Sequence, residues 1–325
     1  MSRYPTVRQF LYNLRSNLSR MASTQNTSLS QAGEKPDGQH PAKSTDYSGL
    51  EHPPAVDALS AAKKQLCSVK AVDIKVQDGV DGKVPGFLHV PQNYRREQSE
   101  GRGKTAAILL SGAGGGVVGP SSIYLSMADK LASLRKGIPV LRMDYRVPAR
   151  NKYCVPDVLA AMDYLHTGYG VSRYVLVGWS FGGAPVFTVG GQDDRVVGCA
   201  TVASQTADTE GIRDVGRKGT PVLLLHGTGD KTLSPRCSQN LYDTYGYSMR
   251  DGDRQIRFFE GDDHALTRNS LQAEDLISRF IMKCAAIDIA EDEIRDVVQK
   301  PLIGDKEKVE KMKQGGDLRG EENVE

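Results

Sequence analysis

The sequence predicts an α/β fold, in which a mostly parallel sheet of eight strands carries helices on both faces. Short apolar, β-branched runs recur along the middle of the chain, and from residue 120 onward helical patterns fall between most of them. In addition, three of these runs are followed directly by a serine, an aspartate or a histidine. The carboxyl ends of parallel strands are where such sheets gather their sites, so the two observations favour the same class.

The expected elements follow one another along the chain. The strands are expected at residues 68–76, 83–90, 106–110, 138–143, 174–177, 196–202, 221–225 and 255–259. The helices are expected at residues 122–135, 155–166, 183–190, 235–245 and 269–285. No helical pattern separates the first two strands, which predicts an antiparallel hairpin at the N-terminal edge of the sheet.

The most informative stretch lies at residues 171–183, where the apolar run YVLV leads into GWSFGG and then into a helical pattern. A serine at the tip of a sharp strand-to-helix turn is held in a strained conformation with its hydroxyl presented for attack. Glycines flank such a serine because side chains would clash across the turn. This pattern indicates a nucleophile elbow with Ser180 as the nucleophile.

Two further residues follow strands in the order expected of a serine nucleophile's partners, first an acid and then a histidine. Asp230 lies in the loop after the seventh expected strand, and His264 lies in the loop after the last one. A serine hydroxyl needs a base to take its proton, and the imidazole needs a carboxylate to orient it. The sequence therefore predicts Ser180, His264 and Asp230 as nucleophile, base and orienting acid.

The negative oxygen formed during attack on a carbonyl needs preorganised hydrogen-bond donors. The first expected donor is the backbone N–H of Phe181, which follows the nucleophile. The second is expected from the glycine-rich loop SGAGGG that follows the third strand, where Ala113 is favoured and Gly114 is the alternative. Glycines in this loop would let the backbone come close to a bound carbonyl.

Residues 67–285 resemble an α/β-hydrolase, of the compact kind represented by dienelactone hydrolases and serine esterases. The resemblance rests on the elbow, on the acid loop HGTGDKTLSP, on the histidine loop GDDHAL and on the oxyanion loop LLSGAGGG. It departs at Ser111-Gly112, where a histidine-glycine pair is common, and at Ser180, where a dienelactone hydrolase carries cysteine. The predicted activity is hydrolysis of an ester or thioester of a soluble small molecule through an acyl-enzyme.

Two other functions remain open. Gly114, Gly116 and Gly119 fit a G-x-G-x-x-G pattern between a strand and a helix, with Asp144 further on, as in a dinucleotide-binding oxidoreductase. That pattern follows the third strand rather than the first, and it leaves the serine, acid and histidine unexplained. The second alternative is an inactive hydrolase fold that serves in binding.

Only residues 203–220 separate the sixth expected strand from the seventh, which is room for one short helix at most. The sequence therefore predicts a minimal cap. We expect an open rim formed by the glycine-rich loop and by Val117, Val118 and Pro120.

Composition agrees with a soluble enzyme, and the predicted chemistry implies neither a metal nor a cofactor. The formal net charge of +2 gives no reason to expect nucleic acid as a partner, and no apolar run is long enough to span a membrane. The five cysteines lack paired spacing, which favours a reducing compartment such as the cytoplasm. The sequence does not indicate an oligomeric state.

The two ends of the chain differ in composition from the middle. Residues 1–66 are polar and are expected to be disordered up to the mid-50s. Within them, residues 1–20 have four arginines, no acid and apolar residues at helical spacing, which fits either a mitochondrial presequence or a solvated basic tail. Residues 286–325 are highly charged, and we expect a helix at 291–298 followed by disorder from residue 306.

Overall fold

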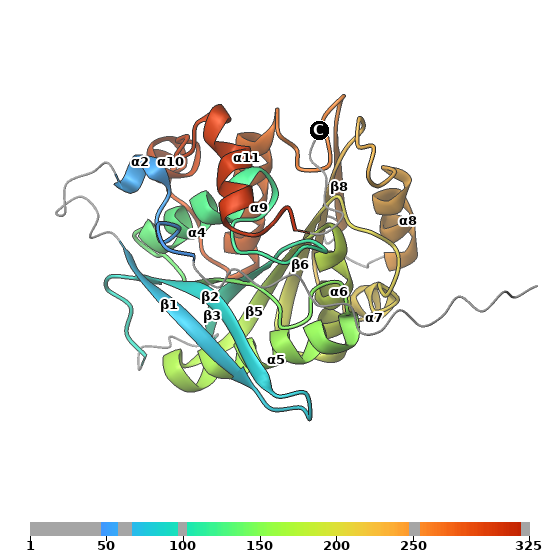
Figure 1. Ribbon diagram of the computed structural model, residues 1–325, viewed down its shortest axis with the longest axis horizontal. Helices are drawn as coiled ribbons and strands as arrows, with labels where there is room; N and C mark the ends of the chain where they lie inside the picture. The colour runs from blue at the N-terminus through green and yellow to red at the C-terminus, as the bar shows by residue number, and fades with distance from the viewer. Residues whose placement is uncertain (1–46, 58–66, 97–102, 247–253, 320–325) are drawn as a thin grey trace, which may run out of the picture. The chain divides into compact units, whose positions relative to one another are not determined.

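The computed structural model describes residues 47–57, 67–96, 103–246 and 254–319, and Figure 1 shows their arrangement. Its centre is one sheet of eight strands. The strands are β1 (Cys67–Val76), β2 (Gly82–Pro91), β3 (Lys104–Leu110), β4 (Val140–Met143), β5 (Val171–Trp179), β6 (Val196–Val202), β7 (Val222–Gly227) and β8 (Arg254–Phe259). Each of these strands overlaps one of those expected from the sequence.

The strand order is β1-β2-β4-β3-β5-β6-β7-β8. β1 pairs antiparallel with β2, β2 pairs antiparallel with β4, and all the remaining pairs are parallel. The mostly parallel sheet and its antiparallel edge hairpin are therefore confirmed. Because β3, β5, β6, β7 and β8 run in the same direction, the loops that follow them meet at one edge of the sheet.

Helices cover both faces of the sheet, as predicted. One core lies between the sheet and α4 (Ile123–Ser133) with α9 (Ser270–Cys284). The other core lies against α5 (Asn151–Tyr169), α6 (Gly183–Gln192) and α8 (Arg236–Tyr245). Alternation along β5 explains the two layers: Val175 and Val177 point into the first core, whereas Leu176 points into the second.

The connection between β6 and β7 holds one short helix, α7 (Ile212–Lys218), so the prediction of a minimal cap is correct at this position. Two 3-10 turns, η1 (Pro120–Ser122) and η2 (Ser180–Gly182), begin the helices that follow β3 and β5. None of the described helices is both long and apolar enough to cross a membrane.

The segments expected to be tails are partly ordered. Residues 47–57 contain the short helix α2 (Pro54–Asp57), and the side chains of Tyr47 and Leu50 are buried against the sheet domain. The expectation of disorder is therefore wrong for these residues. The suggested presequence at residues 1–20 lies outside the described residues.

The C-terminal region is ordered further than expected. The predicted helix at 291–298 is present as α10 (Glu291–Glu293) and the π-helix η3 (Ile294–Val298) that follows it. A second helix, α11 (Asp305–Gln314), occupies residues expected to be disordered, and Met312 and Asp317 are fully buried. The expectation of disorder from residue 306 is thus wrong up to residue 319. In Figure 1, α11 lies on the same side of the sheet as α4 and α9.

Candidate active site

Ser180 occupies a strained turn between β5 and α6. Its φ is +53°, in the left-handed region that residues with a side chain rarely adopt, and its side chain is 5% exposed. The turn closes tightly around two glycines. A Cβ on Gly178 would lie 2.4 Å from the carbonyl oxygen of Gly182, and a Cβ on Gly182 would lie 2.7 Å from that of Leu110. The glycines are therefore required by the close approach of the backbone.

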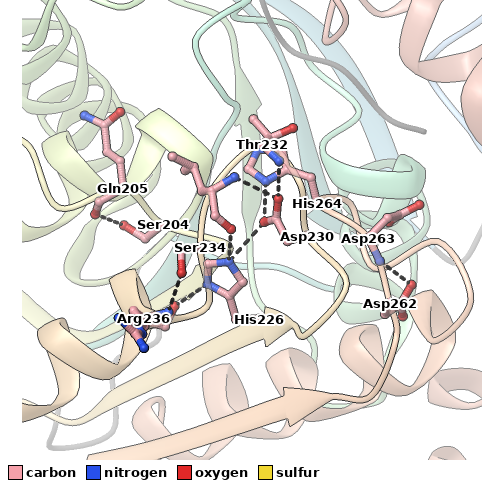
Figure 2. Close-up of polar contacts among 12 residues, drawn as sticks. Ser204, Gln205, His226, Asp230, Thr232, Ser234, Arg236, Asp262, Asp263 and His264 are labelled. Atoms are coloured by element: carbon pink, nitrogen blue, oxygen red, sulfur yellow. Dashed lines mark hydrogen bonds and ion pairs between the residues drawn. The ribbon is translucent and has the colours of Figure 1, made fainter.

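Asp230 and His264 contact each other directly, although 34 positions separate them. Nδ1 of His264 faces Oδ2 of Asp230 (Figure 2), at a distance of 2.7 Å. Both side chains are buried. Asp230 follows β7 and His264 follows β8, so neighbouring parallel strands bring the two loops together. An imidazole held in this way at Nδ1 presents its Nε2 on the opposite side of the ring.

The carboxylate of Asp230 has further partners within its own loop. Its Oδ1 accepts hydrogen bonds of 2.8 Å from the backbone N–H groups of Thr232 and Leu233. Burial opposes ionisation of this carboxyl, but hydrogen bonds from His226 and His264 outweigh it and hold the pKa of Asp230 well below its usual range. Asp230 is therefore a carboxylate at neutral pH.

His226 contacts Asp230 directly, which the sequence analysis missed. Its Nε2 faces Oδ2 of Asp230 at 3.0 Å (Figure 2). The same Nε2 lies 3.0 Å from the carbonyl oxygen of Leu233, and Nδ1 lies 2.7 Å from Oγ of Ser238. Both atoms that face Nε2 are hydrogen-bond acceptors, so Nε2–H is the donor in these two contacts. The four-residue spacing between His226 and Asp230 was the available signal.

The two aspartates beside His264 have other partners. Asp262 accepts hydrogen bonds from the backbone N–H groups of Asp263, Arg268 and Asn269, and it is fully buried. Asp263 accepts from the backbone N–H groups of Ala265 and Thr267. These carboxylates fold the histidine loop, whereas Asp230 contacts the imidazole.

The elbow is joined to the loops around it. Nε1 of Trp179 donates to the carbonyl oxygen of His264 at 3.0 Å, and the two rings lie 5.5 Å apart. The backbone N–H of Gln205, after β6, donates to the carbonyl oxygen of Ser180 at 3.3 Å. The structure thus brings Ser180, Asp230 and His264 to one edge of the sheet.

The expected oxyanion donors lie beside the elbow, but their surroundings differ from the prediction. Phe181 is buried, with its ring 5.9 Å from that of Tyr145, and Ala113 is half-buried. Gly114 lies under the backbone of Arg319, because a Cβ there would come 2.2 Å from the Arg319 carbonyl oxygen. Val117 and Val118 are buried as well. The expected open rim is therefore wrong, since a C-terminal segment covers this loop.

The G-x-G-x-x-G pattern has an internal partner. The backbone N–H groups of Val117, Val118 and Gly119 all donate to the carboxylate of Asp317. Amides in such a loop are what would bind a dinucleotide's pyrophosphate. Because Asp317 already engages them, the geometry argues against the oxidoreductase interpretation.

A group of three side chains could be considered for a metal: the ligand atoms of His52, Cys67 and Asp129 lie within 4.8 Å of one another. However, Asp129 already engages the other two, with Nδ1 of His52 at 2.6 Å and Sγ of Cys67 at 3.6 Å. The charge of the buried Arg142 guanidinium acts on this carboxylate as well. We therefore assign the cluster to anchoring the N-terminal segment on β1 and α4.

Comparison with known proteins identifies the fold. No protein-family model matches the chain, and no curated protein matches its sequence. Among solved structures, it is similar to dienelactone hydrolase from Anabaena variabilis, with 15% identity, a TM-score of 0.52, and coverage of 67% of this chain and 98% of that one. The chain has the α/β-hydrolase fold.

Two other solved structures have the same architecture. One is a cold-adapted esterase from an Arctic intertidal metagenomic library, with 17% identity, a TM-score of 0.51, and coverage of 67% of this chain and 96% of that one. The other is Est1E from Butyrivibrio proteoclasticus with ferulic acid bound, with 16% identity, a TM-score of 0.50, and coverage of 66% and 100%. At these identities the similarity concerns the fold alone.

Proposed function

We propose that this protein is a serine hydrolase that cleaves an ester or thioester of a small molecule through an acyl-enzyme. The observation that carries the proposal is the 2.7 Å contact between His264 and Asp230 at the edge of the sheet where Ser180 occupies a strained elbow. Similarity to esterases supports the class of reaction, and the ferulic acid bound to Est1E supports a small carboxylic ester as the kind of substrate.

In the first half of the reaction, Oγ of Ser180 forms a bond to the substrate's carbonyl carbon while its proton passes to Nε2 of His264. The imidazolium is stabilised by ionised Asp230. The carbonyl oxygen becomes negative and accepts hydrogen bonds from the N–H groups of Phe181 and of Ala113, or of Gly114. When the carbonyl re-forms, the bond to the leaving group breaks and the leaving oxygen or sulfur takes the proton from Nε2.

In the second half, water attacks the acyl-enzyme and gives its proton to His264, which returns it to Ser180 as the acid product leaves. Every proton thus passes through one imidazole, and this chemistry calls for no group beyond the chain's own residues.

The five cysteines, all in the described part of the chain, form no disulfide, which supports a reducing compartment, with the cytoplasm favoured and mitochondria as the alternative.

The test is labelling by a fluorophosphonate together with turnover of a panel of short-chain esters and thioesters. We expect the wild-type chain to be labelled at Ser180 and Ser180→Ala to lose both labelling and turnover, with kcat lower by about 10⁶-fold. Ser204→Ala is the control, because Ser204 lies in the neighbouring loop after β6 and its hydroxyl donates to the Gln205 carbonyl oxygen at 2.9 Å. A folded wild-type chain without labelling would instead support the inactive binding scaffold.

A further inference from the structure

The C-terminal segment, defined as residues 315–319, binds the oxyanion loop, defined as residues 111–119. Asp317 is fully buried in this contact. Its Oδ1 accepts a hydrogen bond of 2.7 Å from the N–H of Gly119, and its Oδ2 accepts from Val118 at 3.0 Å and from Val117 at 3.2 Å. The hydroxyl of Ser111 donates to the same carboxylate. One side chain therefore holds both ends of the loop.

The fit between the two segments is close. A Cβ on Gly116 would lie 2.5 Å from Cγ of Asp317, so the glycine is required for the carboxylate to approach. The N–H of Gly116 itself donates to Oδ1 of Asp144 at 3.0 Å. Four consecutive backbone amides, from residue 116 to residue 119, are thus bound by two carboxylates that lie far apart in the sequence.

The charges of this contact are partly balanced. Arg319 donates through Nη2 to Asp144 at 3.1 Å and to the hydroxyl of Tyr47 at 2.8 Å. Burial raises the pKa of Asp317 to about 7, although hydrogen bonds from Ser111, Val118 and Gly119 act in the opposite direction. Burying the carboxyl group costs free energy, but the loop's buried N–H groups need an acceptor, and Asp317 supplies one that no apolar side chain could.

Helix α11, which precedes the C-terminal segment, also contacts the loop that carries His264. Nζ of Lys308, on α11, donates to the carbonyl oxygen of Thr267 at 3.0 Å, and Ser122 donates to the carbonyl oxygen of Lys308 at 2.7 Å. Ser121 in turn donates to the carbonyl oxygen of Ala265 at 2.9 Å. The C-terminal region is therefore joined to both loops that the proposed reaction uses.

We propose that Asp317 is a positioning residue that fixes the oxyanion loop, so that the N–H of Ala113 or Gly114 is already in place when negative charge develops. This inference rests on the proposed function. It also explains how the loop is supported with Ser111 at its start, because that serine reaches the loop's other end through Asp317. Preorganised donors stabilise a transition state only when their position is fixed before the reaction.

The experiment compares Asp317→Asn with the control Glu310→Gln, which changes an exposed carboxylate on α11. In Asp317→Asn an amide NH₂ replaces one carboxylate oxygen. Because the groups around it are N–H and O–H donors, this NH₂ cannot accept the hydrogen bonds that the oxygen accepted. We expect kcat to fall about 10²-fold with KM nearly unchanged. We also expect hydrogen exchange at the amides of residues 116–119 to become about tenfold faster, without a change in the amides of β5. Glu310→Gln should match the wild type in both measurements.

If Asp317→Asn does not fold, Ser111→Ala removes one hydrogen bond to the same carboxylate and should lower kcat about fivefold. Unchanged exchange in the oxyanion loop, or a loss confined to KM, would refute the role of Asp317. Higher activity in Asp317→Asn would also refute it, because the segment would then be a lid. Absence of fluorophosphonate labelling in the wild-type chain would refute the proposed serine hydrolase. The hydrogen-exchange measurement does not depend on activity, so it tests the role of Asp317 in the loop separately.

Discussion

At the scale of single residues, the carboxylate of Asp230 gathers two imidazoles and two backbone N–H groups. We expect Asp230→Asn to lower kcat by about 10⁴-fold, because the amide favours the wrong tautomer of His264. Asp263→Asn is the matched control, since both hydrogen bonds that Asp263 accepts from described residues go to Oδ1, and the amide keeps an oxygen there. Steady-state kinetics with one ester compare the variants. A large loss in Asp263→Asn with a silent Asp230→Asn would show that the acid is assigned wrongly.

The same carboxylate gives a prediction about pH. Hydrogen bonds from the two imidazoles hold the pKa of Asp230 in the folded chain below that of the unfolded chain, which is about 3.9. Ionised Asp230 therefore stabilises the fold above that pH, and its contribution is lost as the pH falls through the folded value. Denaturant unfolding at a series of pH values below 5 should give a difference in the free energy of unfolding between wild type and Asp230→Asn that shrinks below about pH 4. A difference that widens in acid would contradict this.

At the scale of elements, the N-terminal segment at residues 47–57 is held by hydrogen bonds to charged groups. The hydroxyl of Tyr47 donates to Asp144 at 2.6 Å and accepts from Arg319. We expect Tyr47→Phe to lower the free energy of unfolding by about 1.5–3 kcal/mol. Tyr94→Phe removes a hydroxyl that donates to the neutral carbonyl of Tyr169, so it should cost only about 0.5–1.5 kcal/mol. Urea unfolding measures both, and equal losses would show that Tyr47 gains nothing from its charged partners.

At the scale of the whole molecule, residues 286–319 complete one of the two cores. Val298 and Met312 are fully buried in the core formed with α4 and α9, and Nζ of Lys130 donates to the carbonyl oxygen of Val298 at 2.9 Å. The described residues between 47 and 319 accordingly belong to one compact unit, in which the elements after residue 285 pack on the sheet's helices.

A chain that ends at residue 285 should therefore be less stable than the full chain. Exposing the surface now covered by these two side chains costs about 3–6 kcal/mol, which corresponds to a fall in Tm of about 10 °C. Thermal unfolding followed by circular dichroism measures it, with a chain that ends at residue 319 as the control. An unchanged Tm in the shorter chain would restore the boundary that the sequence suggested.

The sequence by itself determined the sheet, the elbow and the loops that carry Asp230 and His264. Short contiguous patterns in the sequence predict these features, because alternation along a strand and glycines around Ser180 are local requirements of the backbone. Strand polarity then placed the three loops at one edge without any knowledge of side-chain contacts.

Only the tertiary structure decided what supports that edge. Tyr47 and Asp317 lie in segments whose polar composition is typical of tails, yet both contact Asp144 or the oxyanion loop across separations of 97 and about 200 residues. A buried backbone N–H requires some acceptor, but local sequence does not say which distant carboxylate supplies it. The contact between His226 and Asp230 was also not predicted, although only four positions separate them, because it depends on how the loop after β7 turns back.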